Sequence, residues 1–202
     1  MIRFVAAAST LLFATTALAG DGYTTGDTVA NMAVTDSNGV VHNLDDFKGK
    51  TVVLEWTNHG CPYVKKHYKT DNMQTLQKEA AADDVVWLSV ISSAPGKQGY
   101  VSGAEANELT TSRGAAPTAV VLDETGMAGK TFAAKTTPHM YIIDADQTLV
   151  YQGAIDDNPS SNPKTVETAK NYVRQALAEM KSGEAVSEDT TKAYGCSVKY
   201  KS

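Results

Sequence analysis

Short apolar runs recur along the chain and predict the strands of a sheet. The runs at 51–56 (TVVLEW) and 84–91 (DVVWLSVI) are β-branched and nearly uninterrupted by polar residues, which is typical of buried strands. The turn signals DSNG and DADQ each lie between two further runs, which predicts that the chain reverses there. The remaining predicted strands are 31–35, 40–44, 119–122, 139–144 and 149–153.

Between these runs, apolar positions follow helical spacing. The segment 62–82 lacks glycine and has no proline beyond its first residue, and 165–183 has the clearest apolar face, ending at Gly183. Shorter helices are predicted at 104–113 and 124–135, with one helical turn at 45–50. Because strands and helices alternate and two late strands form a hairpin, the order predicts an α/β fold with a mixed sheet covered by helices.

The first 19 residues predict a secretory signal peptide. Arg3 precedes an uncharged, mostly apolar run from Phe4 to Leu18, and Ala-Leu-Ala ends the segment as a small-x-small cleavage pattern. An uncleaved anchor is the alternative, but the run is short for a hydrocarbon core about 30 Å thick, and no later stretch could span a membrane. The predicted organisation is a signal peptide over 1–19, a polar lead over 20–28, one domain over 29–183 and a tail over 184–202.

Charge and cysteine content narrow the partners and the compartment. The formal net charge is −5 and no large basic cluster appears, so nucleic acid is not an expected partner. Export would place the protein in a secreted or periplasmic location, where disulfides persist. The chain has two cysteines, Cys61 and Cys196, and one intramolecular bridge is the simplest arrangement.

Cys61 lies where a predicted strand turns into a predicted helix, in the stretch EWTNHGCPYVKKHY. Pro62 suits the first position of a helix, which makes Cys61 the N-cap or its neighbour. Free backbone N–H groups and the helix dipole would then face the sulfur, and Lys65 and Lys66 would add positive charge. Such surroundings lower a thiol pKa from about 8.5 to roughly 3.5–7.5, so the pattern predicts a reactive thiolate.

These motifs, taken in order, resemble a known superfamily. The strand–WTNHGCPYV–helix segment is similar to the active-site turn of thioredoxin-like proteins, and Thr137-Pro138 before HMYIID resembles their Thr–cis-Pro pair. FKGKTVVL, IIDADQTLVYQG and the terminal GCSVKY are similar to the redoxin, or peroxiredoxin-like, branch. The resemblance covers about residues 29–202 and implies a three-layer thioredoxin-like fold, with a mixed central sheet and flanking helices.

The resemblance also implies roles for individual residues. Cys61 would be the nucleophile, and Thr137 with a cis Pro138 would face it. Glu55 lies six residues before Cys61, where thioredoxins hold a buried acid that serves proton transfer. The alternative for Glu55 is a carboxylate on an exposed strand face.

The sequence departs from both groups of relatives. Val64 stands where thioredoxins carry their second cysteine, and Gly60 looks like an insertion before the Cys-Pro pair. Asn58 and Leu54 replace a threonine and a proline of peroxiredoxins, and Pro138 stands where they have an arginine near the start of the late strand. Neither the dithiol site nor the peroxidase site is therefore complete.

The favoured interpretation is an exported thiol-dependent oxidoreductase that needs no cofactor and no metal. Cys61 would attack a protein disulfide or a small-molecule peroxide, Cys196 would resolve the product, and an external thiol would reduce the resulting bridge. Gly195 beside Cys196 favours a tail that can move over the site. The enzyme would be a thiol-disulfide oxidoreductase or a thiol peroxidase.

Two other interpretations remain open. In one, Cys61 and Cys196 form a permanent structural disulfide in a redox-inert binding module, contributing about 2–4 kcal/mol. In the other, the chain binds copper or zinc, because sulfur and imidazole suit these metals. The candidate ligands are His59, Cys61, His67 and His139, although their spacing in the sequence is not that of a tight metal motif.

Overall fold

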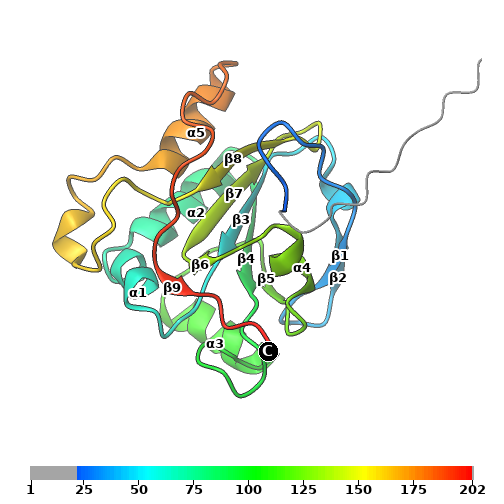
Figure 1. The fold of residues 1–202 in the computed structure, drawn as a ribbon, viewed down its shortest axis with the longest axis vertical. Coiled ribbons are helices and arrows are strands. Elements are labelled where there is room, and N and C mark those ends of the chain that lie inside the picture. Colours follow the sequence, from blue (N-terminus) through cyan, green and yellow to red (C-terminus); the bar gives the residue numbers. More distant parts are fainter. Residues whose placement is uncertain (1–21, 202) are drawn as a thin grey trace, which may run out of the picture.

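A five-stranded sheet forms the centre of the protein (Figure 1). The computed structural model describes residues 22–201, so the predicted signal peptide over 1–19 lies outside the described residues. The sheet order is β5-β4-β3-β7-β8, with β3, β4 and β5 parallel and with β7 and β8 antiparallel to their neighbours. The mixed sheet is therefore confirmed. Its strands are β3 (Val52–Trp56), β4 (Val86–Ile91), β5 (Ala119–Leu122), β7 (His139–Ile143) and β8 (Leu149–Gly153).

Two small antiparallel pairs lie outside this sheet. The first joins β1 (Ala33–Thr35) to β2 (Val41–Asn43), as the DSNG turn predicts. The second joins β6 (Thr136–Thr137) to β9 (Cys196–Ser197), so the tail returns to the body of the protein. This second pair was not predicted.

Helices cover the sheet on both sides. The α-helices are α1 (Pro62–Lys69), α2 (Asn72–Ala82), α3 (Gly103–Ser112), α4 (Met127–Thr131) and α5 (Tyr172–Lys181). Two short 3-10 helices are η1 (Leu44–Phe47) and η2 (Pro163–Thr165). Of the helices within residues 22–201, none is long and apolar enough to cross a membrane.

Alternation along β3 divides the core into two layers. Val53 packs with α2 and α5 on one face of the sheet, whereas Leu54 and Trp56 pack with α4 and the β1–β2 hairpin on the other. In Figure 1, α2 and α5 accordingly lie on the opposite side of the strands from α4 and the hairpin. The predicted three-layer arrangement is confirmed.

The predicted helix over 62–82 is wrong in one respect, because it is two helices. Asp71 has a left-handed backbone with φ of 55°, which no helix can contain. The Thr70 hydroxyl donates to the carbonyl oxygen of Lys66 at 2.9 Å and so binds a group that the last turn of α1 leaves free. The helical spacing was correct on both sides of the break, but nothing in that spacing marks it.

The predicted helix over 165–183 also begins too early. The α-helix starts at Tyr172, with the side chain of Asn171 accepting a hydrogen bond from the backbone N–H of Arg174 at 2.9 Å. Before it, Lys170 and Asn171 pair with the loop after β8 instead of continuing a helix. The predicted helix over 124–135 is similarly shorter, covering Met127–Thr131.

The packing of α2 gives a first test of the fold. Leu76 is 1% exposed in the layer between α2 and the sheet. We expect Leu76→Ala to lower the free energy of unfolding by about 2–5 kcal/mol, because it removes buried methyl groups and leaves a cavity. Urea unfolding followed by circular dichroism measures this value.

The matched control is Lys78→Ala, on the exposed side of the same helix. Its effect should stay within about 0.5 kcal/mol. Equal effects of the two substitutions would contradict the described orientation of α2.

Candidate active site

The turn from β3 into α1 places Cys61 at the helix N-terminus. Cys61 is the N-cap residue and Pro62 is the first helical residue, as predicted. Within the turn, Cys61 N–H donates to the carbonyl oxygen of Asn58 at 3.0 Å, and the Asn58 side chain accepts from Gly60 N–H at 2.9 Å. A Cβ on Gly60 would lie 2.2 Å from the end of the Gln98 side chain, so a larger residue here would displace that side chain from the turn.

The Thr137–Pro138 segment lies against the sulfur of Cys61. The Thr137–Pro138 peptide bond is cis, as predicted. Strand β7 follows directly and pairs with β3, with His139 opposite Trp56. The carbonyl oxygen of Thr137 thereby lies 3.1 Å from Cys61 Sγ.

The tail brings the second cysteine to the same point. Cys196 pairs with Thr137 in the β6–β9 ladder, and its Sγ lies 2.7 Å from Cys61 Sγ, with both cysteines present as free thiols. Cys61 is fully buried, at 0% exposure, whereas Cys196 is partly exposed. Two thiols that are 135 residues apart in the sequence are therefore in contact.

Gly195 lets the backbone of the tail lie close to the backbone of β6 at this contact. Its φ is 139°, and a Cβ there would lie 2.1 Å from the carbonyl oxygen of Thr137. Glycine allows the tail backbone to pass this close to β6. Gly195 thus has a packing role in this structure, and movement of the tail remains a prediction.

The contact between the two thiols shifts their pKa values in opposite directions. Burial opposes ionisation of Cys61, but hydrogen bonds from the Cys196 thiol, the Val64 backbone N–H and the Thr137 side chain together hold the pKa of Cys61 below its usual value. Burial, and then the hydrogen bond to Cys61, raise the pKa of Cys196 to about 11. Cys61 is therefore the more acidic thiol of the pair.

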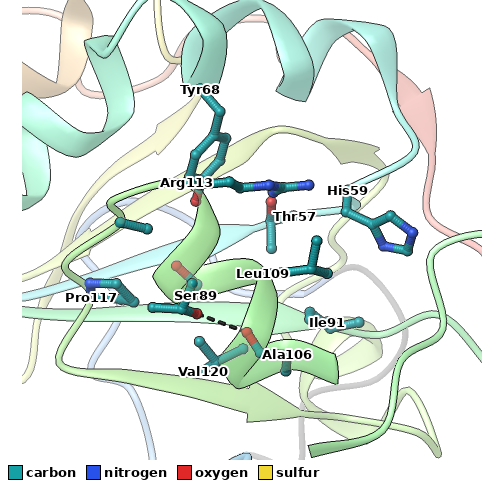
Figure 2. Close-up of a pocket in the computed structure, with 12 residues that line it drawn as sticks. Thr57, His59, Tyr68, Ser89, Ile91, Ala106, Leu109, Arg113, Pro117 and Val120 are labelled. Atoms are coloured by element: carbon teal, nitrogen blue, oxygen red, sulfur yellow. Dashed lines mark hydrogen bonds between the residues drawn. The ribbon is translucent and has the colours of Figure 1, made fainter. Parts of the chain in front are cut away.

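Glu55 is buried, which excludes the exposed-face alternative. It accepts hydrogen bonds from Tyr68 Oη at 3.0 Å, Trp87 Nε1 at 3.0 Å and Ser89 Oγ at 2.9 Å. Burial raises the pKa of Glu55 although these bonds oppose the shift. Tyr68 and Ser89 also line a small cavity beside the active-site turn (Figure 2), and none of the hydrogen bonds of Glu55 goes to Cys61.

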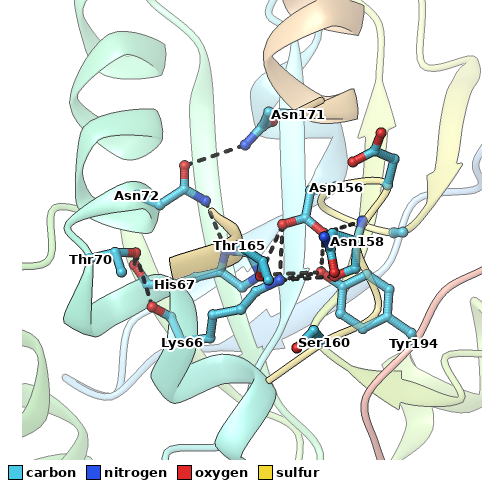
Figure 3. A network of polar contacts seen from close by, with 12 residues as sticks. Lys66, His67, Thr70, Asn72, Asp156, Asn158, Ser160, Thr165, Asn171 and Tyr194 are labelled. Atoms are coloured by element: carbon cyan, nitrogen blue, oxygen red, sulfur yellow. Dashed lines mark hydrogen bonds and ion pairs between the residues drawn. The ribbon is translucent and has the colours of Figure 1, made fainter. Parts of the chain in front are cut away.

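Lys66 does not face the sulfur, which corrects the sequence-based argument. Its ammonium group is buried and contacts Asp156 Oδ2 at 3.1 Å, the Asn158 carbonyl oxygen at 3.0 Å and Tyr194 Oη at 3.1 Å (Figure 3). Tyr194 also donates to Asp156. Because Tyr194 lies two residues before Cys196, this network joins α1, the loop after β8 and the tail.

Sequence reasoning missed this network. No sequence motif points to Asp156, and the position of Lys66 one turn after Cys61 predicts an effect on the thiol instead. An acid directly after a buried strand, in AIDDN, was the available signal, but the sequence does not show which lysine it meets. The three partners come from segments that are 90 and 128 positions from Lys66.

The four proposed metal ligands are dispersed. His67 contacts Asn72 and lies 3.8 Å from Asp156, and burial followed by the charge of Lys66 lowers its pKa to about 4. His139 directs its Nδ1 to Tyr141 Oη, 3.2 Å away. Within residues 22–201, no group of three or more His, Cys, Asp or Glu side chains is arranged to hold a metal ion.

The fold and site define the class of protein. A mixed sheet, a thiol at the N-terminus of α1 and a facing Thr–cis-Pro pair are the features of a thioredoxin-like thiol protein. The redoxin family matches residues 24–172, most of the chain, and the protein belongs to that family. It is thus a thiol oxidoreductase, of the thiol-disulfide oxidoreductase or thiol peroxidase type.

Solved structures share this fold. An uncharacterized conserved protein from Geobacillus kaustophilus is 25% identical with a TM-score of 0.75, covering 90% of this chain and 95% of its own. A hypothetical protein from Sinorhizobium meliloti is 17% identical with a TM-score of 0.75, covering 91% and 98%. The thioredoxin domain of a thiol-disulfide oxidoreductase from Bacteroides vulgatus is 17% identical with a TM-score of 0.51, covering 73% and 98%. No curated protein matches the sequence.

The hydrogen bond between the thiols predicts a specific titration. In the reduced protein, we expect the pKa of Cys61 to be lower than that of an ordinary cysteine thiol and the pKa of Cys196 to be raised to about 11. Cys196→Ala should raise the pKa of Cys61, because it removes a donor to the thiolate. Thiolate absorbance against pH measures both values.

Cys196→Ser is the matched control for this titration, because its hydroxyl keeps a donor. It should raise the pKa of Cys61 less than Cys196→Ala does. Identical titrations of the two variants would show that the contact does not set the acidity of Cys61.

The buried network predicts a large loss of stability. Lys66→Met should lower the free energy of unfolding by about 3–5 kcal/mol, because Asp156 is left as a buried charge without its partner. Lys65→Met, at the exposed neighbouring position, should change it by less than about 0.5 kcal/mol. Denaturant unfolding compares the two, and a Lys66→Met protein as stable as Lys65→Met would be evidence against the ion pair.

Proposed function

We propose that the protein is an exported thiol oxidoreductase in which Cys61 is the nucleophile and Cys196 the resolving thiol. The observation that supports this most is the 2.7 Å contact between the two sulfurs across the β6–β9 pair. The lowered pKa of Cys61 supports its role as nucleophile, because the thiolate is the attacking species. Export after removal of residues 1–19 rests on the signal-peptide pattern of the sequence.

The proposed reaction has two steps within the protein. The Cys61 thiolate attacks one sulfur of a disulfide and expels the other as a thiolate, or attacks a peroxide oxygen, forming a sulfenic acid and releasing an alcohol or water after protonation. Cys196 then attacks Cys61 sulfur, forming a Cys61–Cys196 disulfide and releasing the substrate thiol or water. Two equivalents of an external thiol reduce this bridge and become a disulfide.

The neighbouring groups have supporting roles in this proposal. Thr137 and Pro138 form the wall against which the substrate sulfur or oxygen is aligned, since the Thr137 carbonyl already contacts Cys61 Sγ. Glu55 holds a proton at higher pH than an ordinary carboxyl because burial raises its pKa. We assign it the proton-transfer role expected of a buried acid near the active-site turn, with Tyr68 and Ser89 holding its carboxyl in place.

Access to the nucleophile depends on the tail. Cys61 is fully buried with Cys196 in contact, so a protein disulfide reaches it only when β9 leaves β6. The β6–β9 ladder pairs only two residues of each strand, which makes its opening less costly than that of a longer ladder. A small peroxide needs a smaller displacement than a protein does.

The structural-disulfide alternative has its own support. The tail is held beyond Cys196 as well as before it, since Tyr200 Oη donates to the Ala134 carbonyl oxygen at 2.7 Å and Ala94 N–H donates to the Lys199 carbonyl oxygen at 2.9 Å. A segment held this firmly suits a permanent bridge. The reduction potential separates the cases, because structural bridges lie below about −300 mV and catalytic ones above.

Single-cysteine variants test the assignment. Cys196→Ser should react once with peroxide or with a small disulfide and then accumulate a sulfenic acid or mixed disulfide at Cys61, because no internal thiol resolves it. Cys61→Ser should show no reaction. Stopped-flow kinetics followed by mass spectrometry distinguishes these products.

The wild-type protein is the control, and its oxidation should yield a Cys61–Cys196 bridge that a thioredoxin-type donor reduces. Two free thiols after oxidation would remove the resolving role from Cys196. A bridge that withstands the donor would favour the structural alternative.

A further inference from the structure

A small cavity lies beside the active-site turn, separate from the two cysteines (Figure 2). It is bordered by Thr57 and His59 after the end of β3, by Ser89 and Ile91 of β4, by Val120 near the start of β5 and by α3. The carboxyl ends of parallel strands are where α/β sheets bind ligands, and β3 and β4 reach the cavity from that end. The polar groups on its wall include Thr57, His59, Tyr68, Ser89 and Arg113, and its apolar groups include Ile91, Leu109 and Val120.

Two polar atoms of this cavity have no protein partner. Thr57 is 8% exposed, and its hydroxyl lies close enough to the Glu55 carboxyl to lower the pKa of that group but makes no hydrogen bond of normal geometry among the described residues. His59 Nδ1 is likewise buried without a partner in residues 22–201. The Tyr68 and Ser89 hydroxyls are occupied, because both donate to Glu55. Buried polar groups without a partner are costly, so a ligand or water in the cavity would satisfy Thr57 and His59.

The cavity carries positive charge. The Arg113 guanidinium lies 4.9 Å from the centre of the Tyr68 ring and forms no ion pair with any residue of 22–201. Burial lowers the pKa of His59, and the charges of Arg113 and Lys65 lower it further, each by more than the nearby Glu105 carboxylate raises it. His59 is thus a neutral hydrogen-bonding group next to an unpaired cation, which favours an anion.

The size of the cavity limits the ligand. Its volume is about 30 Å³. One water needs about 10–15 Å³ on this scale, so the space matches two oxygen atoms. A carboxylate presents two oxygens in one plane, which a guanidinium binds with two parallel hydrogen bonds.

We propose that this cavity binds the carboxylate group of a small acid. Arg113 supplies the positive charge, and the Thr57 hydroxyl and His59 Nδ1–H donate to the carboxylate oxygens. His59 lies two residues before Cys61, so the bound acid sits beside the active-site turn. This site goes beyond the proposed function and does not depend on the thiol chemistry.

Acetate is the probe, added to the reduced wild-type protein at constant ionic strength while amide NMR signals are followed. We expect saturable shifts at Thr57 and His59 and no such shifts with the neutral amide acetamide. Arg113→Gln should weaken acetate binding at least about tenfold, because a charged hydrogen-bond partner is lost. Thr57→Val, which keeps the shape of the side chain, should weaken it about threefold or more.

Arg174→Gln is the matched control. Arg174 is an exposed arginine on α5 that pairs with Glu79, and its loss should leave acetate binding unchanged. The proposal is overturned if acetate gives no saturable shift, if acetamide or chloride gives the same shifts, or if both Arg113→Gln and Thr57→Val bind acetate as the wild type does.

Discussion

The pairing of β9 with β6 is the interaction on which the site depends. Thr137 and Cys196 are opposite each other in a ladder that pairs only two residues of each strand. Thr137 in turn contacts Cys61, so this short ladder brings the sulfur of Cys196 to the sulfur that the β3–α1 turn positions. Without it, Cys61 would be a single thiol at a helix N-terminus, and Val64 would leave it without a neighbouring cysteine.

The buried contact of Lys66 with Asp156 and Tyr194 strengthens this arrangement. Removing two charges from water is costly, and their attraction roughly balances that cost. The contact therefore adds little net stability but favours one geometry, because any displacement of the tail separates the Tyr194 hydroxyl from its charged partners. The helix that begins at Cys61 is thus coupled to the segment that carries the second thiol.

Sequence reasoning succeeded where a local signal determines the structure. The Cys-Pro pair defines the start of α1, and the apolar runs define β3, β4 and β7, because backbone sterics and strand burial are encoded in neighbouring residues. It failed at Asp71 and Asn171, where helices break or begin for reasons of side-chain hydrogen bonding and tertiary contact. A helical spacing of apolar residues continues across such points and does not reveal them.

In the candidate site, too, sequence reasoning found the residues that have a local signal and not the contact that has none. Sequence motifs identify four of the candidate residues, which are Cys61, Thr137, Pro138 and Glu55. The structure places Thr137 and Pro138 next to Cys61 Sγ. Glu55 is buried in a separate hydrogen-bonded cluster. The contact with Cys196 has no local signal, because it joins segments that are 135 residues apart. Its register depends on Gly195, whose missing side chain lets the two backbones meet.

The unequal acidity of the two thiols gives the proposed cycle a direction. In thiol–disulfide exchange, the sulfur with the lower pKa leaves faster. A reductant that attacks a Cys61–Cys196 bridge should therefore attack Cys196 and expel Cys61 as the thiolate. Cys196 is also the partly exposed sulfur, whereas Cys61 is buried, so accessibility and leaving-group chemistry select the same atom. Attack there returns Cys61 directly to its nucleophilic form, still in its place at the start of α1.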